Sequence, residues 1–271
     1  MNKSPLRYPG GKTRACKILD AILREHFDVT NFDTIISPFF GGGSFEFYIQ
    51  NNYSFNIIAN DKFTPLYNFW LTCKLESDKE KLCKGLIEKL DRVTKSDFIN
   101  IREKIMDETD IIKQSIMYFI INRCSFSGAT LSGGFSLESS KKRFTKSSVE
   151  RIRKLNLSNF DIYNLDFEDF INMDHNNGNG NRSIMFLDPP YYLEKSSKLY
   201  GKNGNMHDNF DHEKLFKCLS TVGNWIMTYN NCDYIRNLYK DYKIIETSWS
   251  YGMNKSKASS EIVIISKLII P

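Results

Sequence analysis

One carboxylate in this sequence stands where an apolar run breaks off. Residues 184–187 are all apolar, and Asp188, two prolines, Tyr191 and Tyr192 follow directly. Two successive prolines cannot continue a central strand, so the chain leaves the sheet at this point. We therefore expect Asp188 and Tyr191 at the carboxyl edge of a parallel sheet, where open α/β folds keep their ligands.

These residue types suit the task of holding a planar base. The carboxylate of Asp188 and the carbonyl of Pro189, on a rigid Pro-Pro turn, can accept the hydrogens of an exocyclic amine. The aromatic face of Tyr191 can stack on the ring of the same base. We therefore interpret this stretch as a candidate binding place for a nucleobase.

A glycine turn near the N-terminus is a second stretch that points to a ligand. Residues 34–46 predict a strand, a turn of three glycines ending at Gly43, and a helix, so the backbone can pass close to a ligand. A second predicted strand, residues 55–59, leads to Asp61, 18 positions after Gly43. An acid there holds the two hydroxyls of a ribose, so the pattern predicts an adenosine-containing cofactor. The spacing departs from the dinucleotide fingerprint at residues 44–46, which argues against NAD and FAD.

A third cluster surrounds a Pro-Gly turn close to the start of the chain. Arg7, Tyr8 and Lys12 flank this turn, ahead of a helix-like stretch. Residues 11–13 resemble the tail of a phosphate-binding P-loop, but Leu6 stands where that loop needs its first glycine. A plain turn ahead of a helix is the alternative interpretation.

The elements that position these residues follow from the hydrophobic pattern. Strands are also predicted at residues 160–163, 225–229, 242–249 and 261–270, and helices at residues 211–219 and 233–240. Asp166 either caps the helix that follows it or contacts the edge of an adenine. The polar stretch 194–209 lies beside Asp188 and reads as a mobile lid or a DNA-facing loop.

The chain between the second and third predicted strands lacks strand alternation. Its helical patterns span residues 66–75, 79–90, 96–107 and 111–123, with N-caps expected at Asp78 and Ser96. Such a block does not fit between consecutive strands of a doubly wound sheet, so we interpret it as an inserted helical subdomain. A hairpin or extended loop rich in glycine and hydroxyls is expected at residues 125–136.

A run of basic residues follows that loop. It comprises Lys141, Lys142, Arg143, Lys146, Arg151, Arg153 and Lys154. Such a run is either a solvated face or a patch that contacts phosphates, and the neighbouring aromatic, glycine-rich loop supports the second interpretation.

Composition bounds these interpretations. The chain has 271 residues, 41% of them hydrophobic, a net charge of +5 and a pI of about 8.7, which permits a polyanionic partner. The six cysteines are scattered without a C-x-x-C pair, so we expect reduced thiols and no metal site. Without a signal peptide or an apolar run long enough for a bilayer, the chain is expected to be cytoplasmic, without a membrane partner.

The motifs, in their order along the chain, resemble those of Dam-type DNA adenine-N6 methyltransferases. The matching stretches are residues 6–12, residues 37–45, Asn60-Asp61 and Asp188-Pro189-Pro190-Tyr191. The resemblance covers most of the chain and is looser at residues 120–134 and in the last third. One departure is Ser37, where many members carry an acidic residue, and this puts one polar cofactor contact in doubt.

The resemblance implies an α/β fold. Its core would be a mostly parallel, Rossmann-like sheet of the S-adenosylmethionine (SAM) methyltransferases, with a closing antiparallel strand pair. Residues 1–62 and 158–271 would form the catalytic SAM-binding domain, and residues 63–157 an inserted, mainly helical target-recognition domain that binds DNA.

The resemblance also implies roles for individual residues. The catalytic positions would be Asp188, Pro189, Pro190 and Tyr191. The cofactor-binding positions would be Tyr8, Gly10, Gly11, Lys12, Pro38, Phe39, Gly41, Gly42, Gly43, Ser44, Asp61, Asp166 and Asp188. A second departure is residues 127–144, which do not align closely with the family. The DNA-binding positions are therefore expected from the basic run and the loop before it, and they are Arg123, Ser125, Phe126, Ser127, Lys141, Lys142 and Arg143.

The expected reaction moves a methyl group from SAM to N6 of a flipped-out adenine in double-stranded DNA and leaves S-adenosyl-L-homocysteine. The alternatives are methylation of cytosine N4 or of adenine in RNA, and a non-catalytic DNA-binding module. A protein-glutamine methyltransferase is expected to carry Asn where Asp188 stands. We expect a monomer or weak dimer of bacterial, archaeal or phage origin, with a companion restriction endonuclease as a possible partner.

Overall fold

The computed structural model describes residues 1–173, 175, 182–192, 210–249 and 259–268. Within them the strands form one seven-stranded sheet in the order β3-β2-β1-β4-β5-β7-β6. Strands β1 to β5 pair in parallel, while β7 runs antiparallel to both β5 and β6. This confirms the predicted α/β fold with a mostly parallel sheet and a closing antiparallel pair.

The strands lie close to their predicted positions. They are β1 (Thr34–Ser37), β2 (Asn56–Asn60), β3 (Phe160–Tyr163), β4 (Ser183–Leu187), β5 (Trp225–Asn230), β6 (Tyr242–Trp249) and β7 (Ser259–Leu268). The central strands are buried on both faces, which is why they read as continuous apolar runs. Their side chains alternate between two separate cores, one on each face of the sheet.

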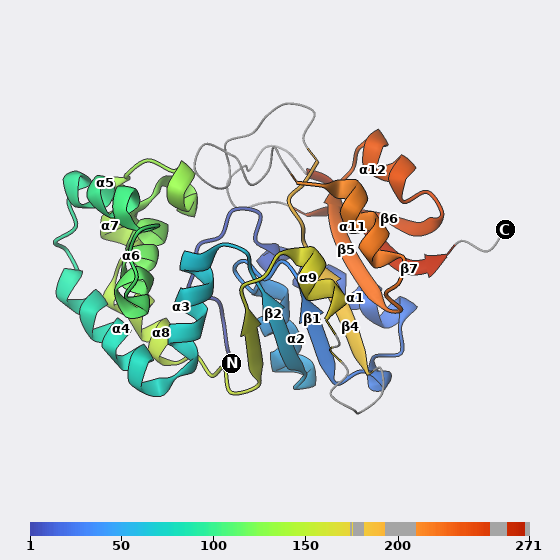
Figure 1. Ribbon diagram of the computed structural model, residues 1–271, viewed down its shortest axis with the longest axis horizontal. Helices are drawn as coiled ribbons and strands as arrows, with labels where there is room; N and C mark the ends of the chain where they lie inside the picture. Colours follow the sequence, from blue (N-terminus) through green and yellow to red (C-terminus); the bar gives the residue numbers. More distant parts are fainter. Residues whose placement is uncertain (174, 176–181, 193–209, 250–258, 269–271) are drawn as a thin grey trace.

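Helices cover both faces of the sheet and extend beyond its β3 end (Figure 1). Helices α1 (Cys16–His26) and α2 (Ser44–Tyr53) share one core with Ile35 and Phe186. Helices α9 (Phe167–Asn172), α11 (His212–Leu219) and α12 (Asp233–Leu238) share the other core with Ile36 and Met185. The loops after the strands therefore emerge at an edge between two helical layers.

The predicted helical block lies next to β3, at the left in Figure 1. It contains α3 (Thr64–Lys74), α4 (Glu76–Lys89), α5 (Lys95–Lys104), α6 (Ile111–Cys124), α7 (Leu137–Arg143) and α8 (Lys146–Arg153). The C-terminal half of α6 is buried on all sides, and its apolar residues belong to the same core as α1 and α2. The helical block therefore packs continuously with one face of the sheet.

Two predicted caps in this block are wrong. Helix α4 begins before Asp78, because the carbonyl of Leu75 already accepts the N–H groups of Asp78 and Lys79 at 3.1 and 2.8 Å. Thr94, not Ser96, caps α5, because its hydroxyl and the carboxylate three residues later satisfy each other's backbone N–H groups.

Residues 125–136 form a compact loop instead of a hairpin. Two short 3-10 turns, η3 (Phe126–Gly128) and η4 (Thr130–Ser132), fill it, and a single antiparallel bridge joins Ser125 to Phe135. Two further 3-10 turns, η1 (Lys12–Arg14) and η2 (Val29–Asn31), flank α1.

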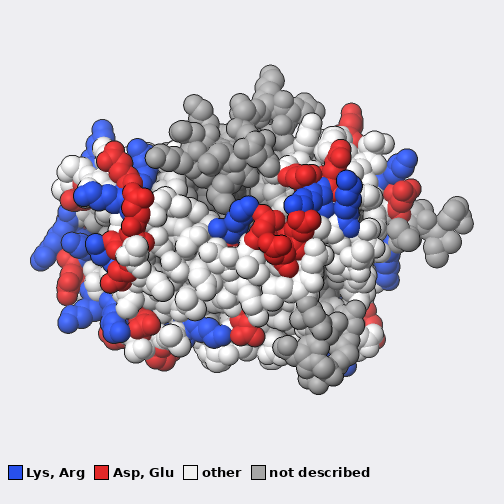
Figure 2. All heavy atoms as spheres, viewed as in Figure 1, with Lys and Arg blue, Asp and Glu red and all other residues white. Residues whose placement is uncertain are grey.

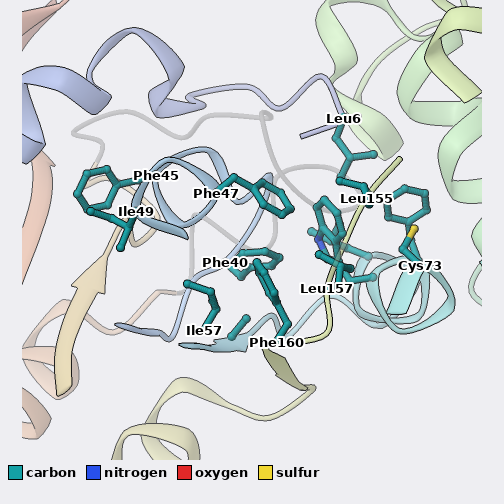
Figure 3. Packing of buried hydrophobic residues seen from close by; sticks show 14 of the residues in the cluster. Leu6, Phe40, Phe45, Phe47, Ile49, Ile57, Cys73, Leu155, Leu157 and Phe160 are labelled. Atoms are coloured by element: carbon teal, nitrogen blue, oxygen red, sulfur yellow. The ribbon is translucent and has the colours of Figure 1, made fainter. Parts of the chain in front are cut away.

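An aromatic cluster anchors the glycine turn that follows β1 (Figure 3). The ring centroid of Phe40 lies 5.2 Å from that of Trp70 in α3 and 5.9 Å from that of Phe160 in β3. The indole of Trp70 donates to the carbonyl of Gly41 at 3.0 Å. These contacts fix the glycine turn to the hydrophobic core and hold its backbone at the edge of the sheet.

The described residues contain no helix that is long and apolar enough to cross a membrane. All six cysteines are free, and every one except Cys232 is buried. No group of three or more His, Cys, Asp or Glu within the described ranges is placed to hold a metal ion.

Candidate active site at the carboxyl edge of the sheet

The predicted site residues meet where the chain order of the sheet reverses. Strands β1 and β4 are neighbours, with β2 beyond β1 and β5 beyond β4. The glycine turn follows β1, Asp61 follows β2 and Asp188 follows β4. Ligands of doubly wound sheets bind at the carboxyl ends of strands around such a switch point.

Lys12 and Asp188 form an ion pair across this edge. The ammonium of Lys12 lies 2.7 Å from Oδ1 and 2.8 Å from Oδ2 of Asp188, although 176 positions separate the two residues. Lys12 is buried, while the side chain of Asp188 keeps 24% exposure. The ammonium also donates to the carbonyl of Gly10 at 2.9 Å and lies 5.0 Å from the ring centroid of Tyr191. Asp188 is thus a charged acceptor with a fixed position that still faces solvent.

The glycine turn adopts a backbone that only glycine accepts without strain. Gly41 and Gly43 have φ angles of +51° and +65°. A Cβ on Gly41 or Gly42 would also stand 2.8 Å from atoms of Tyr8, which packs directly on the turn. The predicted residues Tyr8, Gly41, Gly42 and Gly43 are therefore brought together, with Tyr8 supporting the turn from one side.

The other predicted positions in these two segments make local contacts. Gly11 donates its N–H to the carbonyl of Tyr8 at 3.0 Å, and the hydroxyl of Ser44 lies 3.1 Å from that of Thr13. The carbonyl of Pro38 accepts from the side-chain amide of Asn60 at 3.1 Å. These bonds tie the N-terminal turn and the tips of β1 and β2 into one rigid unit.

Asp61 braces the tip of β2 against the glycine turn. Its two oxygens accept the backbone N–H groups of Gly41 and Phe63, each at 2.9 Å. Burial raises the pKa of Asp61 to about 6, and the two N–H groups oppose this shift. The carboxyl is only partly buried, and each oxygen retains a lone pair for the hydroxyl of a ligand.

Asp166 does cap the helix that follows it. Its Oδ1 accepts the N–H of Glu168 at 3.2 Å at the start of α9, and its Oδ2 pairs with Lys62 at 2.6 Å. Beside it, Phe39 lies within 5.8 Å of the rings of Phe167 and Phe210, measured between centroids. This half-buried aromatic group offers an apolar surface at the same edge of the sheet.

Ser37, where many family members carry an acid, forms a hydrogen bond with a residue in the first turn of α2. The hydroxyl of Ser37 donates to the carboxyl of Glu46 at 2.5 Å, and both side chains are buried. Burial raises the pKa of Glu46 to about 7, with a smaller upward contribution from the charge of Asp188. An acidic group is therefore present beside position 37, although the strand itself carries a hydroxyl there.

Two strands supply contacts that sequence reasoning missed. The hydroxyl of Thr228 in β5 donates to Oδ1 of Asp188 at 2.7 Å. The phenol of Tyr191 donates to Glu261 in β7 at 2.6 Å, and Glu261 is buried. The available signal was a polar residue within or beside an apolar run: Thr228 and Glu46 have apolar neighbours on both sides, and Glu261 directly precedes residues 262–265.

The predicted DNA-binding residues divide into buried and exposed groups. Arg123 and Ser125 are buried, whereas Phe126 is 70% exposed and Lys141, Lys142 and Arg143 are exposed on α7. Ser127 lies in η3, and its side chain falls outside the described residues. Residues 194–209, predicted as a lid or DNA-facing loop, also fall outside them.

Buried Arg123 lies within a group of arginines. Its Nε has no hydrogen-bond partner among the described residues, and its guanidinium lies 5.5 Å from the ring centroid of Phe119. Burial, then the positive charges of Arg151, Arg7 and Arg143, lower its pKa to about 10. Within the described residues, none of these four arginines lies within ion-pair distance of a carboxylate.

Arg7 links this group to the carboxyl edge of the sheet, which the sequence did not predict. Its backbone N–H and carbonyl bond to the side chain of Asn122 in α6 at 2.9 and 2.6 Å. Its guanidinium donates to the carbonyl of Ser125 at 3.3 Å and to the hydroxyl of Ser139 at 3.2 Å. The segment that carries Lys12 is therefore anchored in the helical block.

The surface charge differs between the two ends of the molecule. Figure 2 shows Lys and Arg side chains over the end formed by α4 to α8, with Asp and Glu side chains among them. Acidic side chains gather over α9, whose first turn carries Glu168 and Asp169. Basic and acidic side chains are thus interspersed at the helical end of this face, whereas an acidic cluster lies over α9.

Comparison with known proteins agrees with this geometry. A family model described as D12 class N6 adenine-specific DNA methyltransferase matches residues 8–253. The chain is also similar to the Type II methyltransferase M.MjaIII of Methanocaldococcus jannaschii. The two are 25% identical over 271 positions, an alignment that covers 88% of each chain.

Proposed function

We propose a mechanism from the premise that this chain belongs to the D12 class N6 adenine-specific DNA methyltransferase family. The chain is an adenine-specific DNA methyltransferase, so its reaction requires a methyl donor and an adenine amine. The observation that carries the proposal is the charged, partly exposed carboxylate of Asp188, paired with Lys12 at the switch point of the sheet.

Asp188 and the carbonyl of Pro189 act on the exocyclic amine of adenine. The lone pair of that nitrogen is delocalised into the ring, which makes it a poor nucleophile. Acceptors for its two hydrogens draw the nitrogen toward a tetrahedral shape and localise the lone pair for attack on a methyl group. Fixed groups of this kind contribute about 3–4 kcal/mol each where they have been removed.

Lys12 prepares Asp188 for this role. A carboxylate held at 2.7–2.8 Å by an ammonium keeps one direction, and it needs no reorganisation when the amine arrives. Alignment of the amine with the methyl donor lowers the barrier further. The amine nitrogen gains a bond to the methyl carbon and then loses one hydrogen as a proton to solvent, which Asp188 still faces. During transfer itself the carboxylate therefore acts as a hydrogen-bond acceptor.

SAM is the methyl donor that fits the edge best, and it supplies an electrophilic methyl group on a sulfonium. Asp61 would hold ribose hydroxyls: each of its oxygens accepts one backbone N–H, which leaves further lone pairs, and the residue as a whole is half-buried. Phe39, Phe167 and Phe210 offer an apolar surface for a purine. The positive φ of the glycine turn lets the backbone approach a ligand without side chains.

The substrate is double-stranded DNA with the target adenine flipped out, because the amine cannot be reached inside the stack. Tyr191 provides the stacking surface, a contact worth about 1–3 kcal/mol per base. Residues 1–62 and 158–271 would carry this chemistry, and residues 63–157 would bind the target. The exposed Phe126, Lys141, Lys142 and Arg143 support DNA contact by the helical block.

The setting we propose is restriction–modification, together with a companion endonuclease. The Type II designation of the relative from Methanocaldococcus jannaschii supports it. Methylation of cytosine N4 uses similar acceptor chemistry, but the family that matches this chain is adenine-specific. Mass analysis of nucleosides after incubation with mixed DNA separates the two, since only N6-methyladenine agrees with the family.

Asp188→Ala tests the mechanism directly. We expect methylation to be abolished, while the protein remains folded and still binds DNA, because the acceptor of the amine hydrogens is lost. Single-turnover methylation and DNA affinity measure the two parts. Asp169→Ala, in the first turn of α9, is the matched control and should retain full activity. Near-normal turnover by Asp188→Ala would remove this residue from the chemistry.

A further inference from the structure

The catalytic tetrapeptide is held from the side by the strands β5 and β7. Thr228 in β5 is completely buried, and its hydroxyl donates to Oδ1 of Asp188 at 2.7 Å. Two residues further along β5, the amide of Asn230 donates to the carbonyl of Tyr192 at 2.8 Å. In the sheet register Asn230 faces Glu261 of β7, which accepts the phenol of Tyr191.

Thr228 restricts Asp188 in a way that Lys12 cannot. The ammonium of Lys12 contacts both oxygens of Asp188, at 2.7 and 2.8 Å, so it fixes the charge but distinguishes poorly between the two oxygens. The hydroxyl of Thr228 selects Oδ1, and its side chain is β-branched and stiff on a central strand. The two donors together set the plane of the carboxylate and thereby the direction of its free lone pairs.

Glu261 acts on Tyr191 in a similar way. The hydrogen bond of 2.6 Å holds the phenol end of the ring, and the ammonium of Lys12 lies 5.0 Å from its centroid. The ring of Tyr229, 5.7 Å away and tilted by 32°, supports the same side chain from β5. Tyr191 is therefore held at its phenol end and beside its ring before any base arrives.

We propose that Thr228 and Glu261 are positioning residues for methyl transfer. Thr228 directs the acceptor oxygens of Asp188 at the amine, and Glu261 holds the ring of Tyr191 where the base stacks. This inference rests on the proposed function of Asp188 and adds two residues outside the family motifs quoted above. A competing view gives Thr228 a packing role alone, since it lies in the middle of a buried strand.

Two substitutions at Thr228 separate positioning from packing. Thr228→Val keeps the shape and removes the hydroxyl, whereas Thr228→Ser keeps the hydroxyl and leaves a small cavity. Thr228→Val loses a hydrogen bond to a charged group. We therefore expect its single-turnover rate to fall by roughly 10- to 100-fold. We expect Thr228→Ser to retain the rate with a lower melting temperature, and both variants to bind SAM and DNA as the parent does.

The opposite pattern would overturn the inference. If Thr228→Val is as fast as the parent, or if Thr228→Ser is as slow as Thr228→Val, the hydroxyl does not position Asp188. The control is Asp188→Ala in the same assay. An active Asp188→Ala defeats the proposed function itself, whereas an inactive Asp188→Ala beside a fully active Thr228→Val defeats the positioning role alone.

A double-mutant cycle tests Glu261. Tyr191→Phe and Glu261→Leu each remove one partner of the same hydrogen bond, so their effects on the single-turnover rate should not add. DNA carrying 2-aminopurine at the target position reports whether the flipped base still stacks, and its fluorescence should rise in both variants. Additive rate losses, or unchanged fluorescence in Glu261→Leu, would show that Glu261 does not hold Tyr191.

Discussion

The catalytic edge and the helical block handle positive charge in opposite ways. At the edge, Lys12 is buried against the carboxylate of Asp188, and Lys62 pairs with Asp166. In the helical block, Arg123 is buried and its Nε has no hydrogen-bond partner among the described residues. Burial first, and then the positive charge of neighbouring arginines that include Arg143, lowers the pKa of both Arg123 and Arg7. The edge of the sheet has its countercharges built in. The arginines of this group lack them within the described residues, although other cations of the helical block, such as Arg153 beside Glu80 and Glu150, are paired.

The difference shows how each region uses its charge. Charge that must hold a reacting group in place is paired in advance, because fixed dipoles and ions need no reorganisation during reaction. Charge that meets a polyanion is better left unpaired, because each phosphate contact then releases a counterion from DNA. The unpaired arginines lower the stability of the free protein and favour the bound state.

Lys12→Met removes the cation of the paired region and should have the largest effect on the reaction rate among these substitutions. It keeps most of the apolar stem but leaves the partly buried Asp188 without its cation. Removing one preorganised electrostatic group typically lowers a rate by about 10²- to 10³-fold, so the single-turnover rate should fall by at least about 100-fold. Lys17→Met, on the exposed face of α1, is the control. An unchanged rate would show that the pair does not prepare Asp188.

Glu46→Gln tests the same edge through pH. Burial raises the pKa of Glu46 from 4.5 to about 7, so the folded protein binds a proton that the unfolded chain has released. Its contribution to stability is complete below pH 4.5 and is lost as pH rises through about 7. From low to high pH, the free energy of unfolding of the parent should fall by up to about 3 kcal/mol relative to that of Glu46→Gln, measured by urea unfolding.

The hydroxyl of Ser37 sharpens this test. Its hydrogen bond lowers the pKa of Glu46 and so opposes the effect of burial. Ser37→Ala should therefore move the loss of stability to higher pH, while Glu46→Gln should abolish it. Parallel curves for the parent and Glu46→Gln across the whole range would contradict the assignment.

Arg143→Gln examines the unpaired region and should have the smallest effect. If Arg143 contacts a phosphate, its loss weakens binding to all DNA sequences and makes the salt dependence of log K shallower by about 0.9. Arg153→Gln is the matched control, because Arg153 already pairs with Glu80 at 3.1 Å and with Glu150. An equal change in both variants would mean that the absence of an ion pair within the protein does not identify the arginines that contact DNA.

Much of the fold follows from local patterns. The apolar run ending at Asp188 is a central strand that stops before the prolines, and the strand from Phe160 to Tyr163 has its predicted bounds. Helices α3 to α6 lie within a few residues of the predicted spans, since their apolar spacing is a local property. The caps of α4 and α5 were missed because competing cap residues stand close together in the sequence.

The sequence by itself determined which residues end the strands at the site: the acids Asp61 and Asp188 and the glycine turn. Tertiary structure alone decided which partners these residues meet. Thr228 reaches Asp188 across 40 positions and Glu261 reaches Tyr191 across 70, because the sheet order places β5 beside β4 and β7 beside β5. The physical reason is that apolar runs and turns act over a few residues, whereas strand order depends on the burial of the whole chain.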